Sequence, residues 1–149
     1  MRPISPEKMA EYFPCLIEEG YEEKSLPTPR YNCMAFANDD ERHWWQPGFY
    51  GGKYYWPQGV PQNDSLKAWT AVFTSDGYEI TDNWELEADF EKVAIYIDFN
   101  GETSHVAKSD GFVWKSKLGK KQDIQHSKAT SLEGEMYGVV ERVLRRKKQ

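Results

Sequence analysis

The chain has few of the residues on which metal-binding and disulfide-stabilised proteins depend. Its 149 residues include two cysteines and three histidines. Two cysteines can form at most one intramolecular bridge, which excludes the disulfide framework of a small secreted domain. Cys33, His43, His105 and His126 form no compact ligand pair, and Asp39-Asp40-Glu41 lacks the ligand pattern and glycine of a calcium loop. We therefore expect no metal and no cofactor.

Long apolar runs and a basic surplus are also missing. No segment approaches the roughly 20 apolar residues of a membrane span, and residues 1–7 lack the apolar run of a signal peptide. The net charge of −5 argues against a sequence-independent nucleic-acid binder. We expect a cytoplasmic protein that binds neither membrane nor nucleic acid, with a specialised secretion route left open. The basic residues of 142–149 are interpreted as a solvated tail, or alternatively as a contact for an acidic partner.

The length suits a single domain over residues 1–149. Aromatic residues make up 15% of the chain, while the mean hydropathy is only −0.80, so the core must depend on a limited set of large rings. Residues 1–30 are predicted to hold a short helix that starts at Ser5-Pro6-Glu7, followed by a surface connection.

The remaining elements are predicted from capping residues, turn dipeptides and apolar periodicity. Asn100-Gly101 and Asp110-Gly111 favour two-residue hairpin turns and separate three runs with alternating polarity. Residues 44–63 combine tryptophan and tyrosine with glycine and proline, which indicates a long ordered loop packed by its own rings. The predicted helices are 33–38 and one from Leu66 with Gly77 as its C-cap, and the predicted strands are 93–98, 102–109, 112–117 and 138–144.

Cys33 is the strongest candidate for chemistry, because Asn32 can cap a helix that begins at this cysteine. Peptide N–H groups and the helix dipole favour a thiolate at such a position, and the thiolate is the nucleophile. The sequence therefore predicts an electrostatically activated thiol at Cys33.

His105 is the candidate base. A two-residue turn at Asn100-Gly101 places Tyr96 opposite His105, and one at Asp110-Gly111 places Ser116 opposite His105. The hydroxyl of Ser116 would then orient the imidazole. The same alternation puts His105, Ala107, Trp114 and Ser116 on one face of the sheet, with Val93, Ile95 and Val106 on the other.

Along the chain, a cysteine at a helix start is followed by a histidine on a strand and by a polar residue on the next strand. This order resembles the papain-like superfamily, which includes cysteine peptidases, cell-wall amidases, transglutaminase-like proteins and deamidating toxins. The chain is also similar to a family of small, mostly uncharacterised bacterial proteins. The segments that carry this second similarity are Tyr31-Asn32-Cys33, Trp44-Trp45-Gln46-Pro47, Lys92-Val93-Ala94, Ser104-His105-Val106-Ala107, Trp114-Lys115-Ser116-Lys117-Leu118-Gly119 and Asp123-Ile124-Gln125-His126.

The resemblance implies an α+β papain-like fold in which N-terminal helices pack on an antiparallel β-meander. It also implies acyl transfer on the amide of a protein or peptide, by hydrolysis, deamidation or transamidation. A bacterial effector or toxin is one kind of protein that would carry out such a reaction. Cys33 matches the nucleophile, His105 the base and Ser116 the orienting position, where Asn, Asp or Gln is usual; Asp123 is a rival for that position. No counterpart exists for the upstream oxyanion glutamine, so the backbone N–H of Cys33, aided by Asn32, would take its place.

Simpler interpretations stand beside these. Cys33 is otherwise a small buried hydrophobe, and His105 a strand histidine satisfied by Ser116. The aromatic loop 44–56 is either packed on itself or a substrate-binding wall, with Trp44, Trp45, Trp56 and Trp114 as candidate contacts. In the alternative function, the protein is a catalytically inactive binding module that uses this loop.

Overall fold

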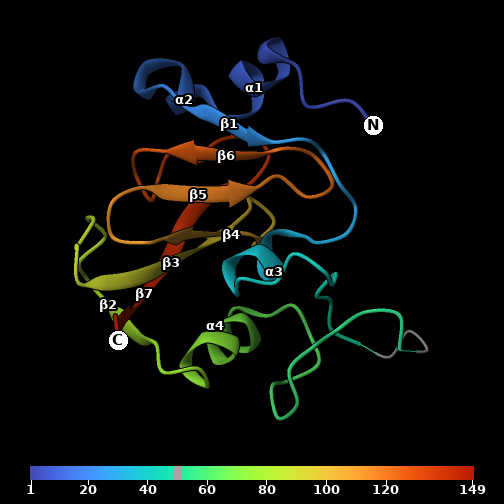
Figure 1. The fold of residues 1–149 in the computed structure, drawn as a ribbon, viewed down its shortest axis with the longest axis vertical. Helices are drawn as coiled ribbons and strands as arrows, with labels where there is room; N and C mark the ends of the chain where they lie inside the picture. The colour runs from blue at the N-terminus through green and yellow to red at the C-terminus, as the bar shows by residue number, and fades with distance from the viewer. Residues whose placement is uncertain (49–51) are drawn as a thin grey trace.

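The computed structural model describes residues 1–48 and 52–149. In these residues the elements are, in chain order, α1 (Pro6–Tyr12), α2 (Pro14–Glu19), β1 (Glu22–Ser25), α3 (Cys33–Ala37), α4 (Leu66–Thr74), β2 (Glu79–Thr81), β3 (Phe90–Ile97), β4 (Thr103–Ser109), β5 (Trp114–Lys117), β6 (Asp123–His126) and β7 (Val139–Lys147). The strands form one antiparallel sheet in the order β1-β6-β5-β4-β3-β7-β2 (Figure 1). The predicted α+β class is confirmed.

Side-chain caps fix where three helices begin. The hydroxyls of Ser5 and Ser65 accept hydrogen bonds from the first turns of α1 and α4, and the Asn32 side chain does the same for α3. All three starts agree with the sequence. The last residue of α4 is Thr74, before the predicted cap at Gly77. No helix in the described part of the chain is long and apolar enough to cross a bilayer.

The core has two main parts, and they contain opposite sets of strand residues. One part joins α1 and α2 to Tyr96, Ala107 and Trp114. The other joins α3 and α4 to Val93, Ile95 and Val106. This division is the one that the alternation along the strands predicts. Cys33, which is partly exposed, packs against the second part.

Several elements differ from the prediction. The first helix was predicted to end before Pro14 and residues 18–30 to form a surface connection, but α2 begins at Pro14 and β1 lies within the predicted connection. Strand β6 was not predicted either. The basic run is not a tail: β7 continues to Lys147 and lies between β3 and β2. Arg145 and Arg146 pair there with carboxylates, so these two charges are neutralised within the fold.

The two hairpins differ in how well their register was predicted. Tyr96 lies opposite His105, as expected. A bulge between Tyr96 and Ile97 then shifts the register, so that Ile97 lies opposite Thr103 and the loop is longer than the predicted two-residue turn. In the second hairpin Ser109 lies opposite Trp114, so four residues form the loop. The Asp110 carboxylate accepts hydrogen bonds from the N–H groups of Phe112 and Val113, at 2.9 and 3.1 Å, and this stabilises the longer loop.

Candidate active site

Asn32 anchors the start of α3 to the aromatic loop. Its side-chain oxygen accepts hydrogen bonds from the N–H groups of Ala35 and Trp45, at 3.1 and 3.2 Å, and its amide nitrogen donates to the Trp45 carbonyl at 2.7 Å. Both ends of the amide are thus engaged inside the protein. Asn32 therefore has a structural role, because it caps α3 and ties the start of this helix to Trp45. Its expected part in substrate or oxyanion binding stays a prediction.

The Cys33 thiol lies close to Val106 on β4. The ladder between β4 and β5 pairs Lys108 with Lys115 and Ser109 with Trp114. Further along β4, the backbone of Val106 hydrogen-bonds the thiol, as do the backbones of Met34 and Cys33 itself. These contacts bring the candidate nucleophile to the residue next to His105, and Figure 1 shows α3 beside β4.

The thiol is not activated in the way the sequence predicts. Burial raises the pKa of Cys33 to about 11, and the backbone hydrogen bonds offset this only in part. The helix has five residues, so its dipole is short, whereas removing the thiolate from water is costly. Cys33 is consequently a neutral thiol at pH 7.

His105 is fully buried and neutral. Its Nε2 lies 2.9 Å from the Ser116 Oγ, so the predicted pair forms even though the register of the hairpin differs. Tyr137 stacks on the imidazole at 4.3 Å between ring centroids, and Tyr96 contacts it edge-on at 5.4 Å. Burial lowers the pKa of His105 well below its usual value, and His126 lowers it further when its own ring is protonated. The ring is held rigidly between partners on three elements of the chain.

The second nitrogen of His105 has no partner. Nδ1 is the one buried side-chain nitrogen or oxygen in the described residues that makes no hydrogen bond. It makes none to the Cys33 thiol either, so no hydrogen bond joins these two side chains. Catalytic hydrogen bonds are often long before substrate binds. An unpaired buried nitrogen in an otherwise satisfied interior is typical of a functional group.

His126 extends the arrangement and was missed as a site residue. Its Nε2 lies 2.8 Å from the Ser116 Oγ, and its Nδ1 lies 3.0 Å from the Lys128 carbonyl. Burial lowers the pKa of His126 to about 4. The signal that could have found it is strand alternation over 123–126, which puts His126 on the same face as Ile124 and beside Ser116.

Lys117 is a second residue that sequence reasoning missed. Its side chain is fully buried, its Nζ donates to the carbonyls of Thr28 and Gly119 at 2.9 and 2.6 Å, and it lies 4.9 Å from the Tyr31 ring centroid. Burial lowers the pKa of Lys117 to about 8, while the charges of Asp123 and Cys33 act in the opposite direction. In turn, the Lys117 charge lowers the pKa of Cys33. A cation therefore lies within electrostatic range of the thiol.

Asp123 does not take the orienting position. Its carboxylate accepts a hydrogen bond from Ser25, and it lies opposite Lys117 in the β5–β6 ladder. Of the two candidates for that position, Ser116 is the one that hydrogen-bonds His105. Asp123 instead stabilises the buried ammonium of Lys117.

The four tryptophans proposed as substrate contacts have different surroundings. Trp114 is fully buried in the core, so it offers no surface to a substrate. Trp45 packs on Tyr55 with ring centroids 4.6 Å apart, and both Trp45 and Trp56 border the part of the core that Cys33 also borders. The Trp44 indole N–H donates to Gln46, and that of Trp56 donates to the Pro61 carbonyl. In the aromatic loop 44–56, Phe49 and Tyr50 lie outside the described residues.

No group of three His, Cys, Asp or Glu side chains within residues 1–48 and 52–149 is arranged to hold a metal ion. Comparison with known proteins gives one family: residues 22–145 match the family described as "Domain of unknown function (DUF7689)". That range includes Cys33, His105, Ser116 and His126. No curated protein and no solved structure matches the chain.

Proposed function

The chain belongs to the DUF7689 family, whose function its description leaves open, and we propose that it is a cysteine-dependent enzyme of papain-like type that acts on an amide bond. The observation that carries the proposal is the unpaired Nδ1 of His105 on the strand whose next residue hydrogen-bonds the Cys33 sulfur. A base that is buried, neutral and fixed through its other nitrogen is suited to taking a proton from a nearby nucleophile.

The reaction starts from a neutral thiol and a neutral imidazole. Cys33 Sγ bonds to the amide carbonyl carbon while its proton moves to His105 Nδ1, and the backbone N–H groups at the start of α3 face the developing oxyanion. Collapse breaks the C–N bond, and the same proton goes to the leaving amine. Water or a second amine then attacks the thioester carbonyl and gives a proton to His105 Nδ1. The C–S bond breaks, the same proton goes to the Cys33 thiolate, and the outcome is hydrolysis, deamidation or transamidation.

The papain-like assignment is supported by the order of these groups along the chain. The nucleophile begins a helix, the base lies on β4, and its hydrogen-bond partner lies on the following strand, β5. The departure is the partner itself: Ser116 provides a hydroxyl where the superfamily usually has a side-chain amide or carboxylate.

The proposal is tested by acyl transfer to the enzyme from a small peptidyl thioester, N-acetyl-phenylalanine benzyl thioester. In the Cys15→Ser background, intact mass is expected to show one acyl group on Cys33, formed faster in the folded protein than in urea. Replacing His105 by Asn should slow this step about a hundredfold, since it removes the general base.

Cys33→Ala in the same background is the control for the site of acylation, and near-UV circular dichroism shows whether each variant keeps its packing. Equal rates with and without His105, or a folded protein that acylates no faster than its unfolded chain, would contradict the proposal.

A second candidate function is a binding module without catalysis. It is favoured by a pocket of about 290 Å³ between the aromatic loop and α4, lined by Trp45, Tyr55, Pro57 and Val72 among others. In this case Trp45→Ala abolishes the phenotype of the protein in its host, while Cys33→Ala leaves it intact. The enzymatic function predicts the reverse, loss of the phenotype with Cys33→Ala at nearly unchanged stability.

A further inference from the structure

We propose that His126 is a positioning residue that acts through Ser116 and fixes which nitrogen of His105 carries the proton. The inference rests on the proposed function for its catalytic consequence, but its structural content stands on hydrogen-bond direction alone. It follows from the chain of contacts that runs from Lys128 through His126 and Ser116 to His105.

The direction of this chain is set at its outer end. The Lys128 carbonyl, 3.0 Å from His126 Nδ1, can only accept a hydrogen bond, so Nδ1 must be the protonated nitrogen. His126 is almost completely buried, and burial keeps the ring neutral at pH 7. A neutral imidazole has one N–H, so His126 Nε2 has a free lone pair and is an acceptor.

The lone pair on His126 Nε2 determines how the Ser116 hydroxyl is oriented. Its hydroxyl has a single hydrogen and lies 2.8 Å from the lone pair of His126 Nε2, so it donates there. The Ser116 oxygen is then left as the acceptor for its other neighbour, His105 Nε2 at 2.9 Å. His105 must therefore carry its proton on Nε2.

The consequence is that Nδ1 of His105 holds a lone pair and no proton. This is the nitrogen that has no partner in the described structure. The stacked Tyr137 and the edge-on Tyr96 contact the ring without hydrogen-bonding that atom. The contacts from His126 thus put the His105 proton on Nε2, so that the unprotonated Nδ1 is also the nitrogen without a hydrogen-bond partner.

Ser116 could not set this tautomer by itself. A hydroxyl donates and accepts equally well, whereas a carboxylate or an amide oxygen only accepts. Without His126, Ser116 could donate to His105 Nε2, which would move the imidazole proton to Nδ1 and block it as a base. His126 therefore supplies the acceptor that makes a serine suitable at the orienting position.

The inference is tested by the tautomers of the histidines, read from two-bond ¹H–¹⁵N correlations in ¹⁵N-labelled protein at pH 7. In the wild type we expect His105 protonated on Nε2 and His126 on Nδ1. His126→Phe keeps an aromatic ring but removes the acceptor, and should shift His105 toward the Nδ1–H form. His126→Gln keeps a side-chain acceptor and should restore the wild-type pattern.

Acylation of Cys33 by the thioester separates this inference from the proposed function. We expect His126→Phe to slow it about tenfold to a hundredfold, and His126→Gln to rescue it. A changed tautomer with an unchanged acylation rate would support the role of His126 and contradict catalysis by His105. The inference would be overturned if wild-type His105 were protonated on Nδ1, or if His126→Phe left the His105 tautomer unchanged. The wild-type spectrum alone gives the first of these tests, even if a variant does not fold.

Discussion

At the scale of single residues, two opposing influences act on the pKa of the Cys33 thiol. The start of α3 and the charge of Lys117 favour the thiolate, while burial favours the thiol, and burial dominates. Because His105 is also held neutral, the resting site contains no thiolate–imidazolium pair. In the proposed reaction, the proton would therefore move only when substrate is attacked, as in hydrolases that use a serine nucleophile.

Alkylation of Cys33 by iodoacetamide tests this balance. In the Cys15→Ser protein we expect an apparent pKa near 11, well above the unperturbed value of about 8.5, and therefore very slow alkylation at pH 7. Lys117→Met removes the nearby cation and should raise the pKa of Cys33 further. Lys115→Met, two residues earlier on β5, is the matched control and should leave it unchanged. An apparent pKa at or below 8.5 would show that burial is not the dominant influence.

The residues that sequence reasoning found and missed share a physical explanation. Cys33, His105 and Ser116 were found because a cap, hairpin turns and alternation act over short stretches of chain. His126 was considered only as a metal ligand, and Lys117 only as part of a motif. Alternation over 123–126 could have shown which face His126 occupies, but the contacts of His126 and Lys117 depend on which strands and loops pack together, and local patterns do not encode that.

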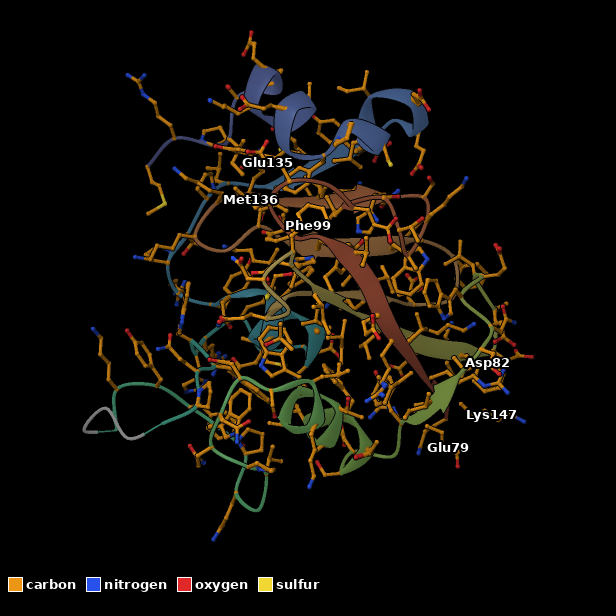
Figure 2. The ribbon with its side chains drawn as sticks, turned by 180° about the vertical axis from the view of Figure 1, so that it is seen from behind. Glu79, Asp82, Phe99, Glu135, Met136 and Lys147 are labelled. Carbon is orange, nitrogen blue, oxygen red and sulfur yellow. The ribbon has the colours of Figure 1, made fainter. Side chains whose placement is uncertain are left out.

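At the scale of elements, the loop between β6 and β7 positions the site. A two-way pair of backbone hydrogen bonds between Gly134 and Gly138 closes this loop, from which Tyr137 stacks on His105. Gly138 has a positive φ of 78° and packs against the end of β3. Figure 2 labels Met136 on this loop and Phe99 in the turn after β3. The loop thus ties the imidazole to the first hairpin.

Gly138→Ala tests this attachment. An added Cβ would lie 2.0 Å from the Ile97 carbonyl oxygen, so the loop must move as well as adopt a strained backbone. We expect a loss of free energy of unfolding above the about 1–2 kcal/mol of the left-handed backbone alone, with altered His105 resonances. Gly101→Ala is the control, since Gly101 has a φ of 80° but nothing within 4 Å of the added carbon. Equal losses in urea unfolding would show that the contact does not matter.

At the scale of the whole molecule, the sheet order brings the site together. β6 pairs with β5 on one side and β1 on the other, which places His126 beside Ser116 and buries both. The same packing holds two neutral histidines in the interior. Stability must therefore depend on pH through these groups.

The sign of this dependence follows from proton binding. An unfolded histidine binds a proton near pH 6.5, whereas His126 in the folded protein does so only near pH 4. Between these values the unfolded chain binds more protons, so stability falls as the pH falls. From pH 7 to pH 5, we expect His126 alone to cost about 2 kcal/mol of unfolding free energy.

Urea unfolding at pH 7 and pH 5 measures this effect. His126→Gln should lose about 2 kcal/mol less than the wild type over the same interval, since its side chain does not titrate. His43→Gln changes an exposed histidine and should behave like the wild type. Identical pH dependence in wild type and His126→Gln would contradict burial of a neutral imidazole.

The sequence by itself determined the α+β class, the helix start at Cys33, the pairing of Tyr96 with His105 and the order of cysteine, histidine and serine. Each depends on a capping side chain, a turn or an alternation within a few residues. Only the tertiary structure decided that the thiol is neutral, that Nδ1 of His105 has no hydrogen-bond partner, and that His126 and Lys117 lie beside the candidate residues. These depend on desolvation and on contacts between distant segments, which exist only once the sheet is assembled.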